Sequence, residues 1–393
     1  MSGIGFFDYL GLKSFLDEDE STVLETFMKF AVAASPVMDE YAWRREPAPG
    51  MWDRMAELGV FGAHVPETYG GTALPDVAYG LMMLGLEAAD SSLRSAASVQ
   101  NALVCYPIHR YGDEEQRRRY LPRLASGALI GAFGLTEPDH GSDPGGMTTT
   151  AVRHAGGYVL NGAKQWITNA DRAGLFVIWA RLEGEVNGFL VERGAPGLST
   201  PALTSRDSLQ AGYVGEIVMS AVEVGEESLL PNGRGLKCPL RCLNEARYGI
   251  AWGVLGAAMT LFNATREYTL TRAQFGNPLA AHQLVQWKLA EMATAITAGL
   301  SLVLHLGRLR ERGKADFAHV SMAKKMNCQA ARRVAMLARD LHGANGISSE
   351  YPVMRHWKNI ESVFTYEGTD HMHGLIIGER LTGIPAYRTT LAP

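Results

Sequence analysis

Apolar residues recur every three to four positions along roughly the first 130 residues of the chain. This spacing places them on one face of a helix. The pattern covers residues 22–30, 51–58 and 79–89, and a shorter helix that begins at Asp113. Thr22 with Glu25, and Asp113 with Gln116, have the spacing of helix-capping boxes. The pattern predicts an N-terminal helical domain over residues 1–130.

The pattern changes between residues 131 and 240, where short apolar runs are separated by glycine and proline. Residues 158–160 and 165–168 flank Asn161-Gly162, a dipeptide that favours a tight hairpin turn. Further strands are expected at residues 175–180, 188–191, 216–219 and 222–224. These features predict a compact middle domain of antiparallel strands over residues 131–240.

Helical spacing returns from about residue 241. One apolar stripe consists of Leu284, Leu289, Met292, Ile296, Leu300 and Val303. A second long helix is expected over residues 322–341, with Ser321 as its N-cap and Gly343 as its stop. Residues 241–393 are therefore predicted to form a four-helix-type bundle. The predicted fold class is α+β, with a helical, a β and a second helical domain in that order.

Composition narrows the function classes. Hydrophobic residues make up 47% and charged residues 20% of the 393 positions, and the formal net charge is −4. No basic block dominates, so nucleic-acid binding is not expected. Four cysteines and the pair His371 and His373 do not form a recognisable metal motif, so no metal site is expected.

Membrane insertion is not expected either. The apolar run from Met292 to Gly307 is shorter than the roughly 20 residues that span a bilayer. The first residues lack the basic and apolar regions of a secretory leader. The sequence therefore predicts a cytoplasmic protein, or a mitochondrial matrix protein if it is a processed eukaryotic form.

The strongest candidate for chemistry is Glu367, in the segment Thr365-Tyr-Glu-Gly-Thr369. It follows the mostly apolar run Ser362-Val-Phe364. Burial beside apolar groups raises the pKa of a carboxyl and makes it a competent general base. The alternative is that Glu367 only caps a helix.

This segment and the order of the three domains resemble the acyl-CoA dehydrogenase family, over about residue 20 to Tyr387. The resemblance implies FAD as cofactor, an acyl-CoA substrate, an electron-transfer flavoprotein as acceptor and a homotetramer. It also implies that Glu367 removes the α-proton of the acyl thioester while the β-hydrogen leaves as hydride to the flavin. Gly368 would bind substrate, and Thr369, Asp370 and Tyr387 would contact the flavin.

Two segments resemble the part of the family's site that surrounds the flavin ring. In the segment from Phe133 to Asp143, the matching residues are Phe133, Leu135, Thr136, Gly141 and Ser142, of which Ser142 would also contact substrate. Trp166, Ile167 and Thr168 resemble the strand that packs against the ring, where an aromatic face suits a flat cofactor. The alternatives are an inter-domain turn and a core tryptophan.

Two further segments resemble those that reach the FAD of a neighbouring subunit. The matching residues are Arg272, Phe275 and Gln283 in the first, and Gly343, Ala344, Asn345 and Gly346 in the second. Arginine supplies forked donors to phosphate oxygens. The alternative for Arg272 is a surface ion pair.

The segment from Leu243 to Tyr248 resembles the helix that lines the acyl-CoA site, with Leu243, Asn244 and Arg247 as substrate-binding residues. Some family members carry their base directly before this arginine, but Ala246 holds that place here. Glu245 is about 100° away around the helix and is expected to face solvent or an ion-pair partner.

The segment from Asp90 to Gln100 resembles glutaryl-CoA dehydrogenases. A buried arginine among small residues needs an anionic partner, which a dicarboxylic acyl chain provides. The resemblance implies that Arg94 and Ser95 hold the distal carboxylate and that Glu87 pairs with Arg94. The reaction implied is oxidation and decarboxylation of glutaryl-CoA to crotonyl-CoA and CO2. The alternative for Arg94 is an ordinary surface ion pair.

Three other functions remain open at this point. They are a non-decarboxylating or other dicarboxylyl-CoA or short-chain dehydrogenase, a desulfinase-type lyase on the same fold, and a non-catalytic flavoprotein. The chain also departs from the glutaryl-CoA dehydrogenase pattern, where the two residues at Asp370-His371 usually stand in the opposite order. Gln210 replaces a common basic residue, and Tyr387 replaces a phenylalanine.

Overall fold

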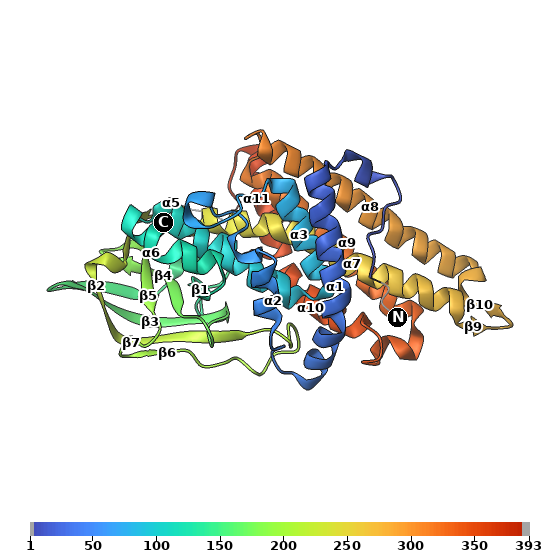
Figure 1. Cartoon of the computed structure of the whole chain (residues 1–393), viewed down its shortest axis with the longest axis horizontal. Coiled ribbons are helices and arrows are strands. Elements are labelled where there is room, and N and C mark those ends of the chain that lie inside the picture. The colour runs from blue at the N-terminus through green and yellow to red at the C-terminus, as the bar shows by residue number, and fades with distance from the viewer. Residues whose placement is uncertain (1–3, 387–393) are drawn as a thin grey trace.

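The computed structural model describes residues 4–386 of the chain. A twisted sheet lies at one end of its long axis and helices form the rest (Figure 1). Along the sequence, helices come first, strands next and helices again, so the predicted α+β class is confirmed. Tyr387 lies outside the described residues.

The first helical part is built around α3. Its helices are α1 (Glu18–Arg44), α2 (Met51–Glu57), α3 (Asp76–Ala89), α4 (Ser91–Ser98), the π-helical η4 (Val99–Cys105), α5 (Tyr106–Tyr111) and α6 (Glu114–Ala125). Nearly all of α3 is buried, because α1 and α7 (Lys237–Thr271) pack against it. Apolar positions on every side of α3 therefore fit its central place.

Capping decides where the helices begin. Asp17 caps α1 by accepting from the amide of Glu20, so the predicted Thr22 start is wrong by several residues. The hydroxyl of Thr22 donates instead to the carbonyl of Glu18 within the helix. The capping box of Asp113 and Gln116 at α6 is confirmed.

The sheet occupies residues 131–234. Its strands are β1 (Gly131–Gly134), β2 (Thr150–His154), β3 (Gly157–Thr168), β4 (Leu175–Leu182), β5 (Glu185–Glu192), β6 (Leu198–Ser199), β7 (Val214–Gly225) and β8 (Leu229–Arg234). The order is β6-β7-β3-β2-β4-β5-β8, with β1 beside β4. Most pairs are antiparallel, as predicted, whereas β1 and β2 each run parallel to β4.

The expected hairpin at Asn161-Gly162 is wrong, because β3 continues through both residues. The dipeptide forms a bulge against β7 instead, with φ 143° at Gly162. A side chain at Gly162 would lie 2.8 Å from the Cα of Thr149, so close approach of the backbone explains the glycine. The actual turn lies between β2 and β3, where Gly156 has φ 91°.

The C-terminal helices are α7, α8 (Gln283–Glu311), α9 (Phe317–Leu341), α10 (Val353–Thr365) and α11 (Asp370–Thr382), with a small hairpin of β9 (Ala273–Gln274) and β10 (Asn277–Pro278). Asp316 caps α9, so the predicted Ser321 N-cap is wrong, and Ser321 is buried inside the helix. By length and hydropathy, α8 could span a membrane, but it packs on α7 and α9. Helices of this kind also form the cores of soluble bundles.

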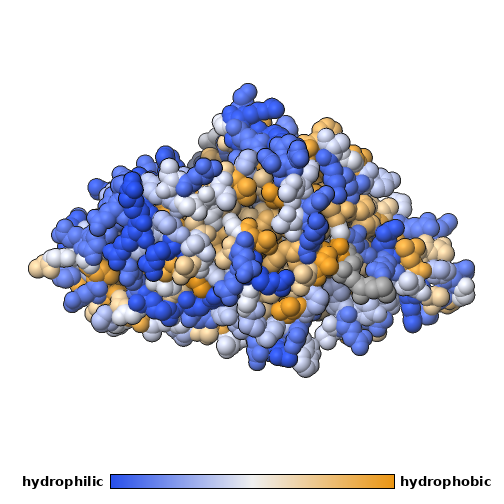
Figure 2. Space-filling view, in the orientation of Figure 1, coloured by the Kyte–Doolittle hydropathy of each residue, from blue (hydrophilic) through white to orange (hydrophobic). Residues whose placement is uncertain are grey.

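Exposed apolar side chains gather at particular places on the helical part. In Figure 2, hydrophobic residues cluster over the middle of this face, whereas the sheet end is mainly hydrophilic. Four apolar residues in or beside the β9–β10 hairpin in sequence are 52–93% exposed, namely Leu270, Phe275, Leu284 and Trp287. Exposed patches of this kind mark contact surfaces more often than scattered single residues do.

Candidate active site

Glu367 lies in the short connection between α10 and α11, where the backbone is unusual. Its φ is 54° and that of Gly368 is 101°, so two consecutive residues lie in the left-handed region. A non-glycine residue in this region costs about 1–3 kcal/mol and persists only where its surroundings hold it. Strain of this kind concentrates at functional sites.

Two buried cations hold this connection by its carbonyl groups. Lys324 on α9 donates to the carbonyls of Tyr366 and Gly368, the latter at 2.8 Å. The Nε of Arg247 on α7 donates to the carbonyl of Glu367 at 2.7 Å. Because two helices hold three successive carbonyls, the backbone from which the side chain of Glu367 projects is held in place.

The electrostatics of Glu367 suit a base. Burial raises the pKa of its carboxyl above the ordinary value of 4.5, while Lys324, Arg94 and Arg247 oppose that shift. Its Oε2 has no hydrogen-bond partner among residues 4–386. Burial also lowers the pKa of Lys324 to about 8. The carboxylate is thus partly desolvated, close to positive charge and available to a bound molecule.

Arg94 is fully buried and reaches toward the same connection. Its Nε donates to Glu87 Oε2 at 2.6 Å, and its Nη2 donates to the hydroxyl of Tyr366. Ser91 donates to the other oxygen of Glu87 at 2.8 Å. The remaining nitrogen, Nη1 of Arg94, has no partner among the described residues. The structure therefore excludes a surface ion pair and leaves one guanidinium edge unpaired.

A glycine on α7 makes room for this ion pair. A side chain at Gly253 would lie 2.4 Å from Glu87 Oε2 and 2.9 Å from the Cγ of Arg94. Only hydrogen fits at that position, so the close packing of α3, α4 and α7 depends on Gly253.

The helix of Arg94, α4, meets the sheet at Ser95. Its hydroxyl lies 3.4 Å from the hydroxyl of Thr168 at the end of β3. Two residues earlier, Trp166 has φ 61° and is 58% exposed, whereas Ile167 is buried. A bulky residue in the left-handed region is uncommon, and an exposed tryptophan on a strand offers a flat apolar face.

A buried ion pair anchors the loop after β1. Lys164 Nζ lies 2.9 Å from Glu137 and also donates to the carbonyl of Leu135. Burial alone would raise the pKa of Glu137, but donors from Thr148, Thr149 and Lys164 lower it to about 2. Phe133 and Leu135 are buried, Thr136 is partly buried, and Gly141 and Ser142 are exposed. The loop therefore has a fixed base and an accessible tip.

The segment from Leu243 to Arg247 lies on α7, as expected. Leu243 and Asn244 are partly exposed, and Asn244 Oδ1 has no partner among the described residues. Glu245 is paired with Arg310 at 2.6 Å, which also pairs with Asp76. This ion pair keeps Glu245 from serving as a base.

The predicted residues do not all converge. Arg272, Phe275 and Gln283 lie around the β9–β10 hairpin, at the opposite end of the molecule from the sheet (Figure 1). The segment Gly343–Gly346 lies near them, because Asn345 Nδ2 donates to Tyr268 on the same end of α7 at 3.1 Å. Ala344 is exposed. Within one chain, these residues are separated from Trp166 and the loop after β1.

The residues just after Glu367 begin α11. Thr369 caps the helix by accepting from the amide of Met372 at 3.3 Å. Asp370 pairs with Lys325 at 2.5 Å and accepts from Gln329 at 2.9 Å. Both carboxylate oxygens of Asp370 are therefore engaged by α9, which leaves it less able to contact a flavin than its position predicts. His371 is exposed.

Matches to family models cover most of the chain. The models described as acyl-CoA dehydrogenase N-terminal, middle and C-terminal domains match residues 17–128, 132–222 and 233–382. The chain belongs to the acyl-CoA dehydrogenase family. An acyl-CoA dehydrogenase of Bacillus subtilis is 35% identical over 336 residues, which are 84% of this chain and 89% of the relative.

Solved structures of glutaryl-CoA dehydrogenase from Mycobacterium smegmatis are also similar to this acyl-CoA dehydrogenase. One has a TM-score of 0.94 at 42% identity and covers 97% of this chain and 99% of its own. Another, in complex with FADH2, has the same TM-score at 40% identity and covers 98% of this chain and 100% of its own. The residues present fit the family's FAD, because Trp166 offers an exposed aromatic face beside Thr168 and an anchored loop lies next to it.

The sequence patterns did not predict several residues of this acyl-CoA dehydrogenase site. Lys324 is the clearest example, although its spacing could have revealed it. It continues the helical stripe of Val320, Cys328 and Ala331, all buried, so a lysine there needs internal acceptors. Lys164 and Glu137 gave no such signal, because they meet only when β3 passes the loop after β1.

Proposed function

We propose that this chain oxidises glutaryl-CoA and releases the distal carboxyl as CO2. The observation that carries the proposal is the unpaired Nη1 of the fully buried Arg94, close to a loop that holds a desolvated glutamate. A buried donor without a partner costs about 1–3 kcal/mol, which a bound carboxylate would recover. Ser95 offers a hydroxyl on the same helix.

In the proposed reaction, Glu367 takes the α-proton of the thioester. FAD, when bound, would accept the β-hydrogen with its two electrons. Trp166, Thr168 and the loop from Phe133 to Ser142 would hold the FAD. Loss of CO2 from the resulting enoyl thioester leaves a carbanion that the conjugated carbonyl delocalises, and return of the proton held by Glu367 gives crotonyl-CoA. Arg94 holds the departing carboxylate at a fixed place, and Leu243, Asn244, Arg247 and Gly368 line the thioester arm. An orienting contact of this kind lowers the activation barrier, because the substrate has already lost its rotational and translational freedom on binding.

Mixing the purified protein with glutaryl-CoA under anaerobic conditions tests the proposal directly. We expect the flavin absorbance to bleach with glutaryl-CoA and much less with butyryl-CoA. With an artificial electron acceptor, the expected products are crotonyl-CoA and CO2. Accumulation of glutaconyl-CoA would overturn the decarboxylation, and equal bleaching by both thioesters would overturn the dicarboxylate preference.

We further propose that a second copy of the chain completes each FAD site, within a homotetramer. Arg272, Phe275, Gln283 and Gly343–Gly346 are remote from the rest of the site in one chain, and apolar side chains near Phe275 are exposed. Changing Trp287→Glu should lower the molar mass in solution and release FAD together. Retention of FAD by a monomeric variant would contradict this arrangement.

The remaining expectations follow from the same proposal. An electron-transfer flavoprotein would accept the electrons, and its reduction by the protein with glutaryl-CoA is measurable in a coupled spectrophotometric assay. No reduction in that assay would point to another acceptor. The cytoplasmic location stays a prediction.

A further inference from the structure

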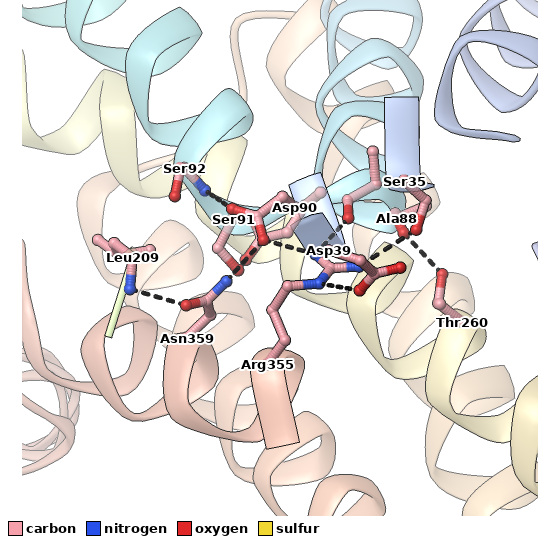
Figure 3. A network of polar contacts seen from close by, with 12 residues as sticks. Ser35, Asp39, Ala88, Asp90, Ser91, Ser92, Leu209, Thr260, Arg355 and Asn359 are labelled. Atoms are coloured by element: carbon pink, nitrogen blue, oxygen red, sulfur yellow. Dashed lines mark hydrogen bonds and ion pairs between the residues drawn. The ribbon is translucent and has the colours of Figure 1, made fainter. Parts of the chain in front are cut away.

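Asp90 joins the helix of Arg94 to the rest of the molecule. It is fully buried between α3 and α4. Its Oδ1 accepts from the amide of Ser92 at 2.7 Å and so caps α4. Its Oδ2 accepts from Arg355 at 2.5 Å and from Asn359 at 2.8 Å (Figure 3). Arg94 follows one helical turn after Asp90.

Both side-chain partners of Asp90 lie on α10, which ends two residues before Glu367. Arg355 also donates to Asp39 on α1 at 2.6 Å and to the carbonyl of Ala89 at 2.7 Å. Figure 3 shows these side chains converging from α1, from the junction of α3 and α4, and from α10. One carboxylate therefore ties the helix of the candidate carboxylate-binding arginine to the helix that leads into the connection of Glu367.

Asn359 extends the cluster to the middle domain. Its Oδ1 accepts from the amide of Leu209 at 2.7 Å, and Leu209 has φ 53°. Leu209 precedes β7, which pairs with β3, the strand of Trp166 and Thr168. The cluster thus contacts α4, α10 and the segment that leads into β7.

Helices α4 and α10 are joined at two places. The first is Asp90 with Arg355 and Asn359, and the second is the hydrogen bond from Arg94 to Tyr366. Two separated contacts stop the helices from sliding past each other. Because burial is complete at Asp90 and nearly so at Asn359, water cannot readily replace either contact.

We propose that Asp90, Arg355 and Asn359 are positioning residues that set the distance from Arg94 to Glu367, and thereby the length of dicarboxylyl chain that reacts. This inference rests on the function proposed above. A distal carboxylate held by Arg94 and an α-carbon presented to Glu367 are separated by a fixed number of bonds. A chain one methylene longer or shorter cannot satisfy both groups unless the two helices move.

Two variants test this with limited disturbance. Asp90→Asn keeps an N-cap acceptor but removes the charge that pairs with Arg355. Arg355→Lys keeps the charge but cannot reach Asp39, Ala89 and Asp90 together. Arg308→Lys is the matched control, because Arg308 pairs with Glu20 between α8 and α1, away from the site.

The readout is kcat/KM for glutaryl-CoA, for adipyl-CoA, which is one methylene longer, and for butyryl-CoA, which has no distal carboxylate. A displacement of about 1 Å can cost about 100-fold in rate. We expect both variants to lower the glutaryl-to-adipyl ratio about 10-fold or more, with kcat on butyryl-CoA within about 3-fold of wild type. The control should leave the ratio unchanged.

Parallel losses on all three substrates would mean that the cluster only stabilises the fold, and would overturn the inference. An unchanged ratio in folded Asp90→Asn would do the same, even if Arg355→Lys failed to fold. If the wild-type protein did not prefer glutaryl-CoA over butyryl-CoA, the proposed function itself would fail. A wild-type preference that survives in the variants defeats the positioning role alone.

Discussion

The guanidinium of Arg94 donates a hydrogen bond to the hydroxyl of Tyr366, the residue directly before Glu367. The two residues are 272 positions apart in sequence. The guanidinium also lies over the tyrosine ring, with its central carbon 5.4 Å from the ring centroid. The candidate carboxylate-binding residue and the candidate base are therefore linked through one side chain.

Removing the positive charge of Arg94 should lower activity on glutaryl-CoA much more than activity on butyryl-CoA. Arg94→Gln is expected to lower kcat/KM on glutaryl-CoA about 100-fold or more, because truncating one partner of a buried charge pair costs about 2–5 kcal/mol. Activity on butyryl-CoA should fall far less. Because the change leaves Glu87 buried and unpaired, the double variant with Glu87→Gln serves as the control for folding. Equal losses on both thioesters would mean that Arg94 does not bind the carboxylate.

Glu367→Gln should abolish proton abstraction and leave the fold intact. A general base contributes about 10²- to 10⁴-fold, so a loss of kcat in that range is expected in steady-state assays. Flavin absorbance and circular dichroism should match those of the wild type. Full turnover by this variant would favour a lyase that needs no such base.

The pH profile should depend on Lys324. Burial raises the pKa of Glu367, and kcat/KM is lost as pH falls through that raised value, because the base becomes protonated. Lys324 opposes the shift, so Lys324→Met should move the acid limb of the profile to higher pH. Lys325→Met is the matched control, since Lys325 pairs with Asp370 instead. A limb that moved equally in both variants would contradict the assignment.

Gly368→Ala should lower both stability and kcat. Its φ of 101° strains any side chain, and a Cβ would lie 3.0 Å from His373 Nε2 and 3.2 Å from Arg247 Nη2. Gly374→Ala is the control, because nothing lies within 4 Å of its Cβ position on α11. Because alanine favours the helix more than glycine does, Gly374→Ala should stabilise the fold by up to about 1 kcal/mol. Thermal melts and kcat of the two variants can be compared directly.

Acid should destabilise the fold through neutral, desolvated histidines. Burial lowers the pKa of His64 to about 3 and that of His373 to about 2, from an ordinary 6.5. Between about pH 6.5 and those values, the unfolded chain binds protons that the folded chain does not. Stability is therefore lost as pH falls, by about 1.4 kcal/mol per pH unit for each histidine.

His64→Phe tests this loss, because it keeps the ring that stacks on Tyr79 at 3.8 Å between centroids. Unfolding midpoints in urea between pH 7 and pH 5 should then fall less steeply than in the wild type. Replacing the exposed His154 with Asn should leave the slope unchanged. A wild-type slope in His64→Phe would show that His64 does not carry the effect.

Local signals in the sequence were sufficient for the order of helices, strands and helices. Periodicity depends on neighbours along the chain, which is why the capping box at Asp113 was also found. The same local reasoning failed at Asn161-Gly162, where pairing with β7 makes the dipeptide a bulge instead of a turn. It also misplaced the starts of α1 and α9, because any nearby acidic or hydroxyl residue can supply a cap.

For the site, the sequence by itself determined residue types: a glutamate in an apolar setting, an arginine among small residues and a glycine-rich loop. Tertiary structure decided which of them meet. The clamp of Lys324 and Arg247, the left-handed backbone at Glu367 and the tie between Asp90 and Arg355 all join segments far apart in sequence. Periodicity can show that a side chain such as Lys324 is buried, but it does not show which distant residue that side chain meets, since this depends on how whole helices pack.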